Sequence, residues 1–185
     1  MGFDLKLWLV RHAQPLIAPG VCYGATDVSA DEQATLEAAQ ALAQVVPQGL
    51  LVMASTLQRC ELLKHVFKDL RPDLSYKIDA RLAEMNFGQW EGQRWDAIPA
   101  DELKQWTDNF GSHACGGAES VHQFMARVGA VWDETQAQGK DAVWLTHAGV
   151  IRAATLLSQG IRSLSDAQHW PQQAPGFGEW CVLAL

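Results

Sequence analysis

LWLVRHA at residues 7–13 and VWLTHA at residues 143–148 share one pattern, an apolar run followed by one polar residue and then His-Ala. Each apolar run has the length of a single buried β-strand. A third apolar run, at residues 50–54, ends in Ser55-Thr56, a pair that can cap a following helix. The sequence therefore predicts three buried strands, each followed at once by polar side chains.

The stretches between these strands carry apolar residues at helical spacing. We expect helices at residues 31–45, 56–70, 119–136 and 150–158, bounded by breakers such as Pro47, Pro72 and Gly139. Two further strands are expected near residues 76–79 and 180–184. Strands that alternate with helices predict an α/β sheet. Since 185 residues without a low-complexity tract suit one domain, we expect a single domain over residues 1–185.

Composition predicts a soluble protein with reduced thiols. The hydrophobic fraction is 48%, and no window approaches the roughly 18 consecutive apolar residues of a membrane-spanning helix. The N-terminus lacks the long apolar stretch and cleavage site of a signal peptide, so we expect a cytoplasmic location. Four cysteines without a C-x-x-C pair are typical of packing residues rather than of a disulfide framework.

The net charge of -7 argues against a nucleic-acid binder, which needs a basic face to replace counterions on the phosphate backbone. A small anionic substrate requires only a local concentration of positive groups, and this need not appear in the total. The sequence therefore favours a small ligand, with no nucleic-acid or membrane partner. It does not set the oligomeric state.

In an α/β sheet, ligands bind outside the carboxyl ends of the strands. The residues expected at that edge are Arg11, His12, Ser55, Arg59 and His147. Guanidinium groups match the doubly charged phosphomonoester with paired N–H donors and a permanent charge. An arginine is more often a solvated surface residue, but both of these follow a buried strand. The edge therefore predicts a phosphate pocket that contains Arg11 and Arg59.

A histidine that attacks phosphorus must be unprotonated and fixed in orientation. Nearby arginines lower the pKa of His12, and a hydrogen bond from its other ring nitrogen to a backbone carbonyl would fix the reactive tautomer. His147 precedes a helix N-terminus and can donate to a phosphoryl oxygen. We therefore predict His12 as the nucleophile and His147 as a phosphate ligand. The other four histidines lack this context and are interpreted as packing or surface residues: His65, His113, His122 and His169.

The leaving alcohol needs a proton from a carboxylic acid. LAEMNFGQWEG at residues 82–92 offers Glu84 and Glu91, and reasoning from the residues alone leaves both open. No H-x-x-x-H or H-E-x-x-H spacing occurs, so we expect a reaction without a metal ion or other cofactor.

Five motifs in order give the chain a resemblance to the histidine phosphatase superfamily, also called phosphoglycerate mutase-like. They are LVRHA at 9–13, STLQR at 55–59, the segment 82–92, GAES at 117–120 and THAGVIR at 146–152. The resemblance implies a three-layer α/β/α sandwich with a mainly parallel sheet and one antiparallel strand. It implies that His12 is phosphorylated, that Arg11, Arg59 and His147 hold the phosphate, and that Glu84 is the proton donor while Glu91 is structural.

RHAQP at 11–15 and CYGATD at 22–27 resemble the alpha-ribazole phosphatase subgroup, which implies alpha-ribazole 5'-phosphate of cobalamin biosynthesis as substrate. The second motif adds Tyr23 and Gly24 as substrate-binding candidates. Tyr23, Trp90 and residues 95–117 are candidate walls of the substrate site, but we interpret each of them as a packing residue. A broad-specificity or sugar-phosphate phosphatase remains the main alternative, and a mutase or a non-catalytic phospho-ligand binding module the lesser ones.

Overall fold

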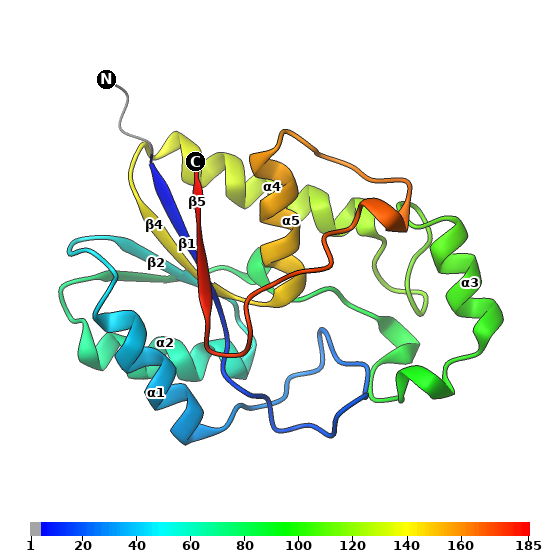
Figure 1. Ribbon diagram of the computed structural model, residues 1–185, viewed down its shortest axis with the longest axis horizontal. Coiled ribbons are helices and arrows are strands. Elements are labelled where there is room, and N and C mark those ends of the chain that lie inside the picture. Colours follow the sequence, from blue (N-terminus) through cyan, green and yellow to red (C-terminus); the bar gives the residue numbers. More distant parts are fainter. Residues whose placement is uncertain (1–4) are drawn as a thin grey trace.

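The sheet at the centre of the molecule has five strands in the order β3-β2-β4-β1-β5 (Figure 1). The computed structural model describes residues 5–185. The strands are β1 (Lys6–Arg11), β2 (Leu51–Ala54), β3 (Ser75–Ile78), β4 (Ala142–Thr146) and β5 (Trp180–Ala184). All neighbouring pairs are parallel except β1 and β5, which are antiparallel. The sheet is therefore mainly parallel with one antiparallel edge strand, as the resemblance implied.

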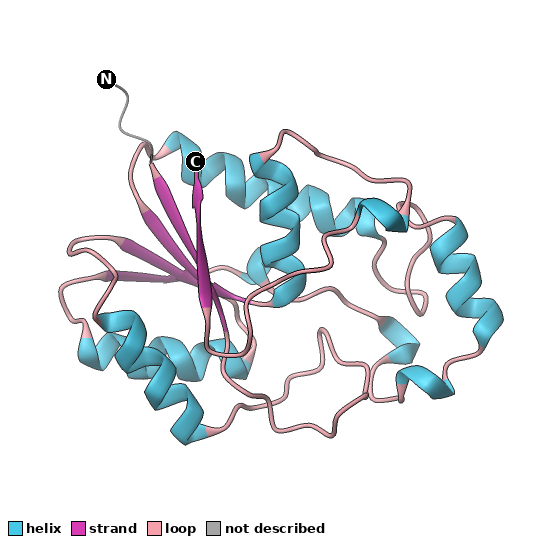
Figure 2. Ribbon diagram, viewed as in Figure 1, coloured by secondary structure: helices cyan, strands magenta, loops and turns pink. Residues whose placement is uncertain are grey.

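Helices cover both faces of the sheet (Figures 1 and 2). On one side lie α1 (Glu32–Ala43) and α2 (Gln58–Leu70), and on the other α4 (Val121–Ala137) and α5 (Ala148–Ser158). Successive side chains of a strand point to opposite faces, so β1 feeds two cores. Trp8 and Val10 pack in the α1/α2 core, while Leu7 and Leu9 pack in the α4/α5 core. The expected three-layer α/β/α sandwich is confirmed.

The helix starts differ in detail from the predictions. The helix expected at 31–45 begins after Asp31, whose carboxylate accepts the N–H of Ala34 at 2.8 Å. The helix expected at 56–70 begins at Gln58, and the predicted Ser55-Thr56 cap is wrong. Asp27 takes that place, because its carboxylate accepts the N–H of Gln58 at 2.7 Å. The Ser55 hydroxyl accepts the N–H of Leu57, one residue before the helix, at 3.3 Å.

The other two predicted helices also shift by a residue or two. The one expected at 119–136 begins after Ser120, which forms a capping box with Gln123. The one expected from residue 150 begins directly after His147, at Ala148. Both starts matter for the site described below, because they place motif residues immediately before a helix.

A long connection of residues 79–120 joins β3 to α4 and holds a helix that was not predicted, α3 (Ala100–Asp108). It is short, and its apolar contacts with the core come from Leu103 and Trp106, which are only partly buried, so its pattern was too brief to be recognised as a helix. Three short 3₁₀ helices precede it, at Ala80–Leu82, Gly88–Trp90 and Trp95–Ala97. Figure 1 shows α3 at the end of the molecule away from the sheet.

The carboxyl ends of β1, β2 and β4 meet at one edge of the sheet. Arg11 pairs with Thr146 in the strand register. One residue further, the N–H of His12 donates to the Thr146 carbonyl at 3.1 Å, and the N–H of Ser55 donates to the Leu145 carbonyl at 3.0 Å. Three polar residues, His12, Ser55 and His147, therefore leave the sheet side by side.

Within residues 5–185 no helix combines the length and apolar character that crossing a bilayer requires. The four cysteines are free, and Cys22, Cys60 and Cys115 are buried.

Candidate active site

His12 is buried, with 3% of its surface exposed, and its ring is held by its own chain. Its Nδ1 lies 2.7 Å from the Ala13 carbonyl oxygen, so Nδ1 carries the proton and donates it there. No hydrogen bond to Nε2 occurs within residues 5–185. The lone pair of Nε2 is thus available. Burial and the charge of Arg59 lower the pKa of this ring to about 3, with Arg11 adding to the effect.

Arg59 has no exposed surface and bonds entirely within the protein. Its Nη1 donates to the Thr26 carbonyl at 2.8 Å, its Nη2 to the Gly24 carbonyl at 2.6 Å, and its Nε to Nδ1 of His147 at 3.3 Å. A guanidinium has five N–H donors, so two remain on the terminal nitrogens. Its charge is therefore held in place with part of its donor set unused.

His147 is fully buried beside His12, with ring centroids 5.2 Å apart. Since Nδ1 accepts from Arg59, Nε2 carries the proton and donates to the Ser55 hydroxyl at 2.8 Å. Burial and the neighbouring His12 and Arg59 lower its pKa well below the ordinary value. The sequence analysis predicted that this ring donates a hydrogen bond to a phosphoryl oxygen. In the structure both nitrogens already have protein partners, so a phosphoryl oxygen would have to replace Ser55 as the acceptor.

Arg11 lies under an aromatic ring that the sequence analysis did not single out. Its guanidinium carbon is 3.9 Å from the ring centroid of Phe177, whose ring also lies 5.6 Å from that of His12. Nη1 of Arg11 donates to the Pro175 carbonyl, while its buried Nε has no partner among the described residues. Burial lowers the pKa of Arg11, opposed by the nearby Tyr23 hydroxyl and Glu84 carboxylate. Phe177 lies between Gly176 and Gly178, a signal of a turn but not of a site.

Tyr23 and Gly24 both contact the guanidinium of Arg59. The Tyr23 ring centroid is 5.2 Å from the Arg59 guanidinium carbon. Gly24 donates its N–H to Glu91 and accepts from Arg59, so both of its backbone groups already have partners. A Cβ at this position would lie 1.8 Å from the Met85 carbonyl oxygen. Gly24 therefore allows a close approach of two backbone segments, and its contact with substrate stays a prediction.

The two glutamates of the 82–92 segment occupy different environments. Glu91 accepts the backbone N–H groups of Gly24, Ala25 and Thr26, the Thr26 hydroxyl and the N–H of Phe87. Burial raises the pKa of Glu91, but these hydrogen bonds outweigh burial and lower it overall. With its oxygens occupied in this way, Glu91 organises the loop that holds Arg59.

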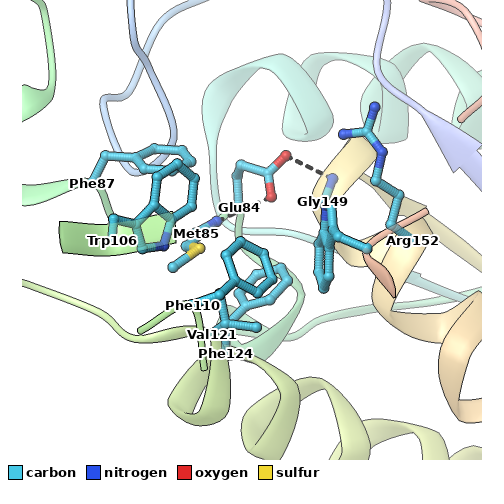
Figure 3. A pocket seen from close by; sticks show the side chains of 10 residues that line it. Glu84, Met85, Phe87, Trp106, Phe110, Val121, Phe124, Gly149 and Arg152 are labelled. Carbon is cyan, nitrogen blue, oxygen red and sulfur yellow. Dashed lines mark hydrogen bonds between the residues drawn. The ribbon is translucent and has the colours of Figure 1, made fainter. Parts of the chain in front are cut away.

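Glu84 lies at the N-terminus of α5. Its Oε2 accepts the N–H of Gly149 at 2.9 Å, drawn as a dashed line in Figure 3, and its Oε1 accepts the N–H of Met85 at 3.0 Å. Its charge acts on Arg11 and Tyr23, so it belongs to the same site. A Cβ on Gly149 would come within 2.1 Å of Oε1. Glycine is therefore needed at position 149 for the carboxylate to lie where it does.

A cavity of about 120 Å³ opens beside Glu84 and is walled mainly by aromatic rings (Figure 3). Its lining residues are Glu84, Met85, Phe87, Trp106, Phe110, Val121, Phe124, Gly149, Arg152 and Trp170. Two of them, Trp106 and Phe110, come from the 95–117 stretch, for which packing was the favoured interpretation. Trp90, by contrast, is a core residue with 2% of its surface exposed. Arg152 was not singled out as a site residue, although its place at the end of the THAGVIR motif could have indicated it.

The arrangement as a whole brings together two neutral imidazoles, two arginines and a carboxylate, a set of groups that suits an anionic ligand. No group of three metal-binding side chains occurs within the part of the chain that the structure describes. The family model of the histidine phosphatase superfamily (branch 1) matches residues 7–175. The chain belongs to this superfamily. As a histidine phosphatase it is a phosphoric monoester hydrolase, and the resemblance inferred from five motifs is confirmed.

Individual relatives of this histidine phosphatase carry different substrate names. "Putative phosphoserine phosphatase 2" of Hydrogenobacter thermophilus is 25% identical over 161 residues, which are 84% of this chain and 79% of the relative. A mycobacterial glucosyl-3-phosphoglycerate phosphatase has 23% identity and a TM-score of 0.79, over 96% of this chain and 89% of the other. A "putative alpha-ribazole-5'-P phosphatase" of Escherichia coli has 21% identity and a TM-score of 0.78, over 97% and 90%. The two structures show the common fold.

Neutral, buried His12 makes the folded protein sensitive to acid. Its pKa is about 3 in the folded chain against 6.5 for an ordinary histidine, so the unfolded chain takes up the proton first as the pH falls. The contribution of this ring to the free energy of unfolding is therefore complete above pH 6.5 and is lost as the pH falls toward 3. Urea melts between neutral pH and roughly pH 4.5 should show a loss about 2 kcal/mol larger for the wild type than for His12→Asn. Equal losses would contradict a neutral ring.

Gly149→Ala should displace the Glu84 carboxylate, because the new methyl group and Oε1 cannot both be accommodated. A misplacement of about 1 Å in a site can cost on the order of 100-fold in rate, so we expect a loss of that order on an alkyl phosphate. The matched control is Gly129→Ala in α4, where the nearest atoms lie 3.5 Å from the added Cβ. Steady-state rates check the comparison, and circular dichroism melts check that both variants fold. Full activity in Gly149→Ala would show that Glu84 does not need this position.

Proposed function

We propose that this phosphatase acts through a phosphohistidine formed on Nε2 of His12. The observation that carries the proposal is the fixed tautomer: Nδ1 donates to the Ala13 carbonyl, and the neutral Nε2 lies beside two guanidinium groups. In the first step the Nε2 lone pair forms a bond to phosphorus while the ester P–O bond breaks. Glu84 gives its proton to the departing alkoxide.

In the second step a water molecule attacks the phosphorus of phosphohistidine. Glu84, now a carboxylate, takes the proton of that water, the P–N bond breaks, and His12 returns to its neutral form with release of inorganic phosphate. The same residue serves as acid and then as base, as microscopic reversibility suggests. Glu91 is excluded from this role in the proposal because its oxygens are occupied by loop hydrogen bonds.

Charge on the phosphoryl oxygens is balanced by Arg11, Arg59 and His147. Among residues 5–185, Arg11 keeps a buried Nε without a partner, and Arg59 keeps two N–H donors. His147 donates through Nε2 once a phosphoryl oxygen takes the place of the Ser55 hydroxyl. Donors that are fixed before the reaction stabilise the charge that develops in the transition state.

The aromatic cavity beside Glu84 supports alpha-ribazole 5'-phosphate as the substrate. The leaving alcohol must lie next to the acid, and in alpha-ribazole this alcohol carries an aromatic benzimidazole base. A cavity of about 150 Å³ lined by apolar side chains can bind benzene, so 120 Å³ with aromatic walls suits the insertion of one ring edge.

The free thiols of the chain agree with a cytoplasmic location, where such groups stay reduced.

Arg152 favours a second candidate, an ester whose alcohol carries a carboxylate or sugar hydroxyls. It lines the same cavity, and its buried Nε has no partner among residues 5–185. A guanidinium matches a carboxylate with paired donors. Phosphoserine and glucosyl-3-phosphoglycerate, named for two relatives, are esters of this kind.

Rapid quenching with labelled substrate in the presence of EDTA should trap an acid-labile, base-stable phosphoryl group on His12. His12→Ala should abolish the label, because the other neutral ring at the phosphate, His147, has no free lone pair: its Nδ1 accepts from Arg59 and its Nε2 carries the proton. His169→Ala is the control, since His169 is an exposed histidine outside the site and should not change labelling. Label on serine, cysteine or aspartate, or activity that requires an added metal, would refute this mechanism.

Alpha-ribazole 5'-phosphate and ribose 5-phosphate carry the same ester and differ in the base. If the aromatic cavity binds the base, kcat/KM should be on the order of ten-fold or more higher for alpha-ribazole 5'-phosphate, as expected for apolar groups in a matching pocket. Phe110→Ala should reduce this ratio by its effect on the first substrate alone. Equal rates for the two esters would reject the base as a recognised group. Preference for phosphoserine or glucosyl-3-phosphoglycerate, lost in Arg152→Met, would favour the second candidate.

A further inference from the structure

The segment that carries Glu84 is held by side chains rather than by a sheet or an α-helix. Four successive carbonyls, those of residues 81–84, each accept a hydrogen bond from a side chain. Thr146 donates to the Leu82 carbonyl at 2.8 Å. The other three bonds come from one residue, Arg127 of α4. The position of Glu84 in the site therefore depends on where Arg127 lies.

Arg127 uses all five N–H donors of its guanidinium. Nη1 donates to the carbonyls of Arg81 and Ala83, both at 2.7 Å, and Nη2 donates to the carbonyl of Glu84 at 3.0 Å. The remaining two bonds, from Nε at 2.6 Å and Nη2 at 3.1 Å, go to the carboxylate of Glu119. No lysine could replace this pattern, because an ammonium lacks the planar fork of donors.

Glu119 also holds the backbone on the C-terminal side of Glu84. Its Oε2 also accepts the N–H of Asn86 at 3.0 Å. Glu119 belongs to the GAES motif at 117–120, for which the phosphate chemistry provides no role. Its ion pair with Arg127 is largely covered, with 15% and 22% of the two side chains exposed. The backbone is thus fixed both before and after Glu84, while the carboxylate is aimed by the N–H groups of Met85 and Gly149.

We propose that the Glu119–Arg127 pair is a positioning device that fixes Glu84 for proton transfer to the leaving group. The proposal rests on the assignment of Glu84 as the acid under the proposed function. Neither member of the pair bonds to a phosphate ligand; Arg127 bonds to backbone carbonyls and Glu119, with Phe124 packed against its guanidinium at 4.6 Å. They act through Glu84.

The test compares two substrates that differ in their need for the acid. An alkyl alcohol leaves poorly without a proton, whereas p-nitrophenolate leaves nearly unaided. Arg127→Met should therefore slow reaction of the alkyl phosphate by on the order of ten-fold or more, while the stopped-flow burst with p-nitrophenyl phosphate survives. Arg162→Met is the matched control. It removes an exposed arginine paired with Asp133, with about half of each side chain exposed, and should change neither rate.

A double-mutant cycle separates positioning from a general loss of structure. If Arg127 acts through Glu84, then Arg127→Met should cost little more on the alkyl ester once Glu84→Gln is present, because the two effects are coupled. Glu119→Gln keeps the size of the side chain and weakens the pair, so it should give the same substrate selectivity with a smaller loss. It also decides the question if Arg127→Met fails to fold.

The outcomes distinguish this proposal from the one beneath it. Equal losses on both substrates in Arg127→Met and Glu119→Gln, or additive losses with Glu84→Gln, would overturn the positioning role while leaving Glu84 as the acid. If Glu84→Gln itself showed no dependence on the leaving group, the acid assignment of the proposed function would fail instead.

Discussion

The charged guanidinium of Arg59 is fully buried, and the other residues of the site are arranged around it. A buried charge is tolerated only when hydrogen bonds replace the water it has lost. Two of those bonds go to the carbonyls of Gly24 and Thr26, so the 24–26 loop must lie against α2. That loop in turn is held by Glu91, whose carboxylate accepts its three backbone N–H groups. Glu91 and Arg59 therefore stabilise opposite edges of one loop, and the removal of either would leave the other poorly compensated.

The buried charge also decides the protonation of both histidines. His12 and His147 lie beside Arg59 with almost no exposed surface, and burial together with this charge lowers both pKa values. A protonated ring would add a second buried cation within the same cluster. The rings are therefore neutral, and each is fixed in one tautomer by what its Nδ1 contacts: the Ala13 carbonyl for His12 and the Arg59 Nε for His147. The proposed nucleophile, His12, is therefore kept neutral by the same buried charge around which the proposed phosphate site is arranged.

Much of this could be predicted from residues that follow a strand directly. Two apolar runs predict that His12 and His147 each follow a strand. Parallel strands bring their carboxyl ends to one edge, so the two histidines were expected to lie close together. Residues that reach the site across long sequence separations were harder. Phe177 covers Arg11 from a chain segment more than 160 residues away, and periodicity carries no information on such contacts. Ser55 was interpreted as a helix cap because it comes shortly before the expected helix. The residue that accepts the N–H of Gln58 is Asp27, which is distant in sequence and cannot be found from local spacing.

The irregular segments of the site share one construction. In the 24–26 loop, Arg59 donates to backbone carbonyls and Glu91 accepts backbone N–H groups. In the 81–86 segment, Arg127 donates to three carbonyls and Glu119 accepts the N–H of Asn86. Backbone groups that no helix or sheet satisfies must find partners, or their burial is costly. In each segment an arginine and a glutamate meet that need, and the chain can follow a path that neither a strand nor a helix allows. This explains why motif residues such as Glu91 and Glu119 need no contact with phosphate: they shape the backbone from which the reacting groups project.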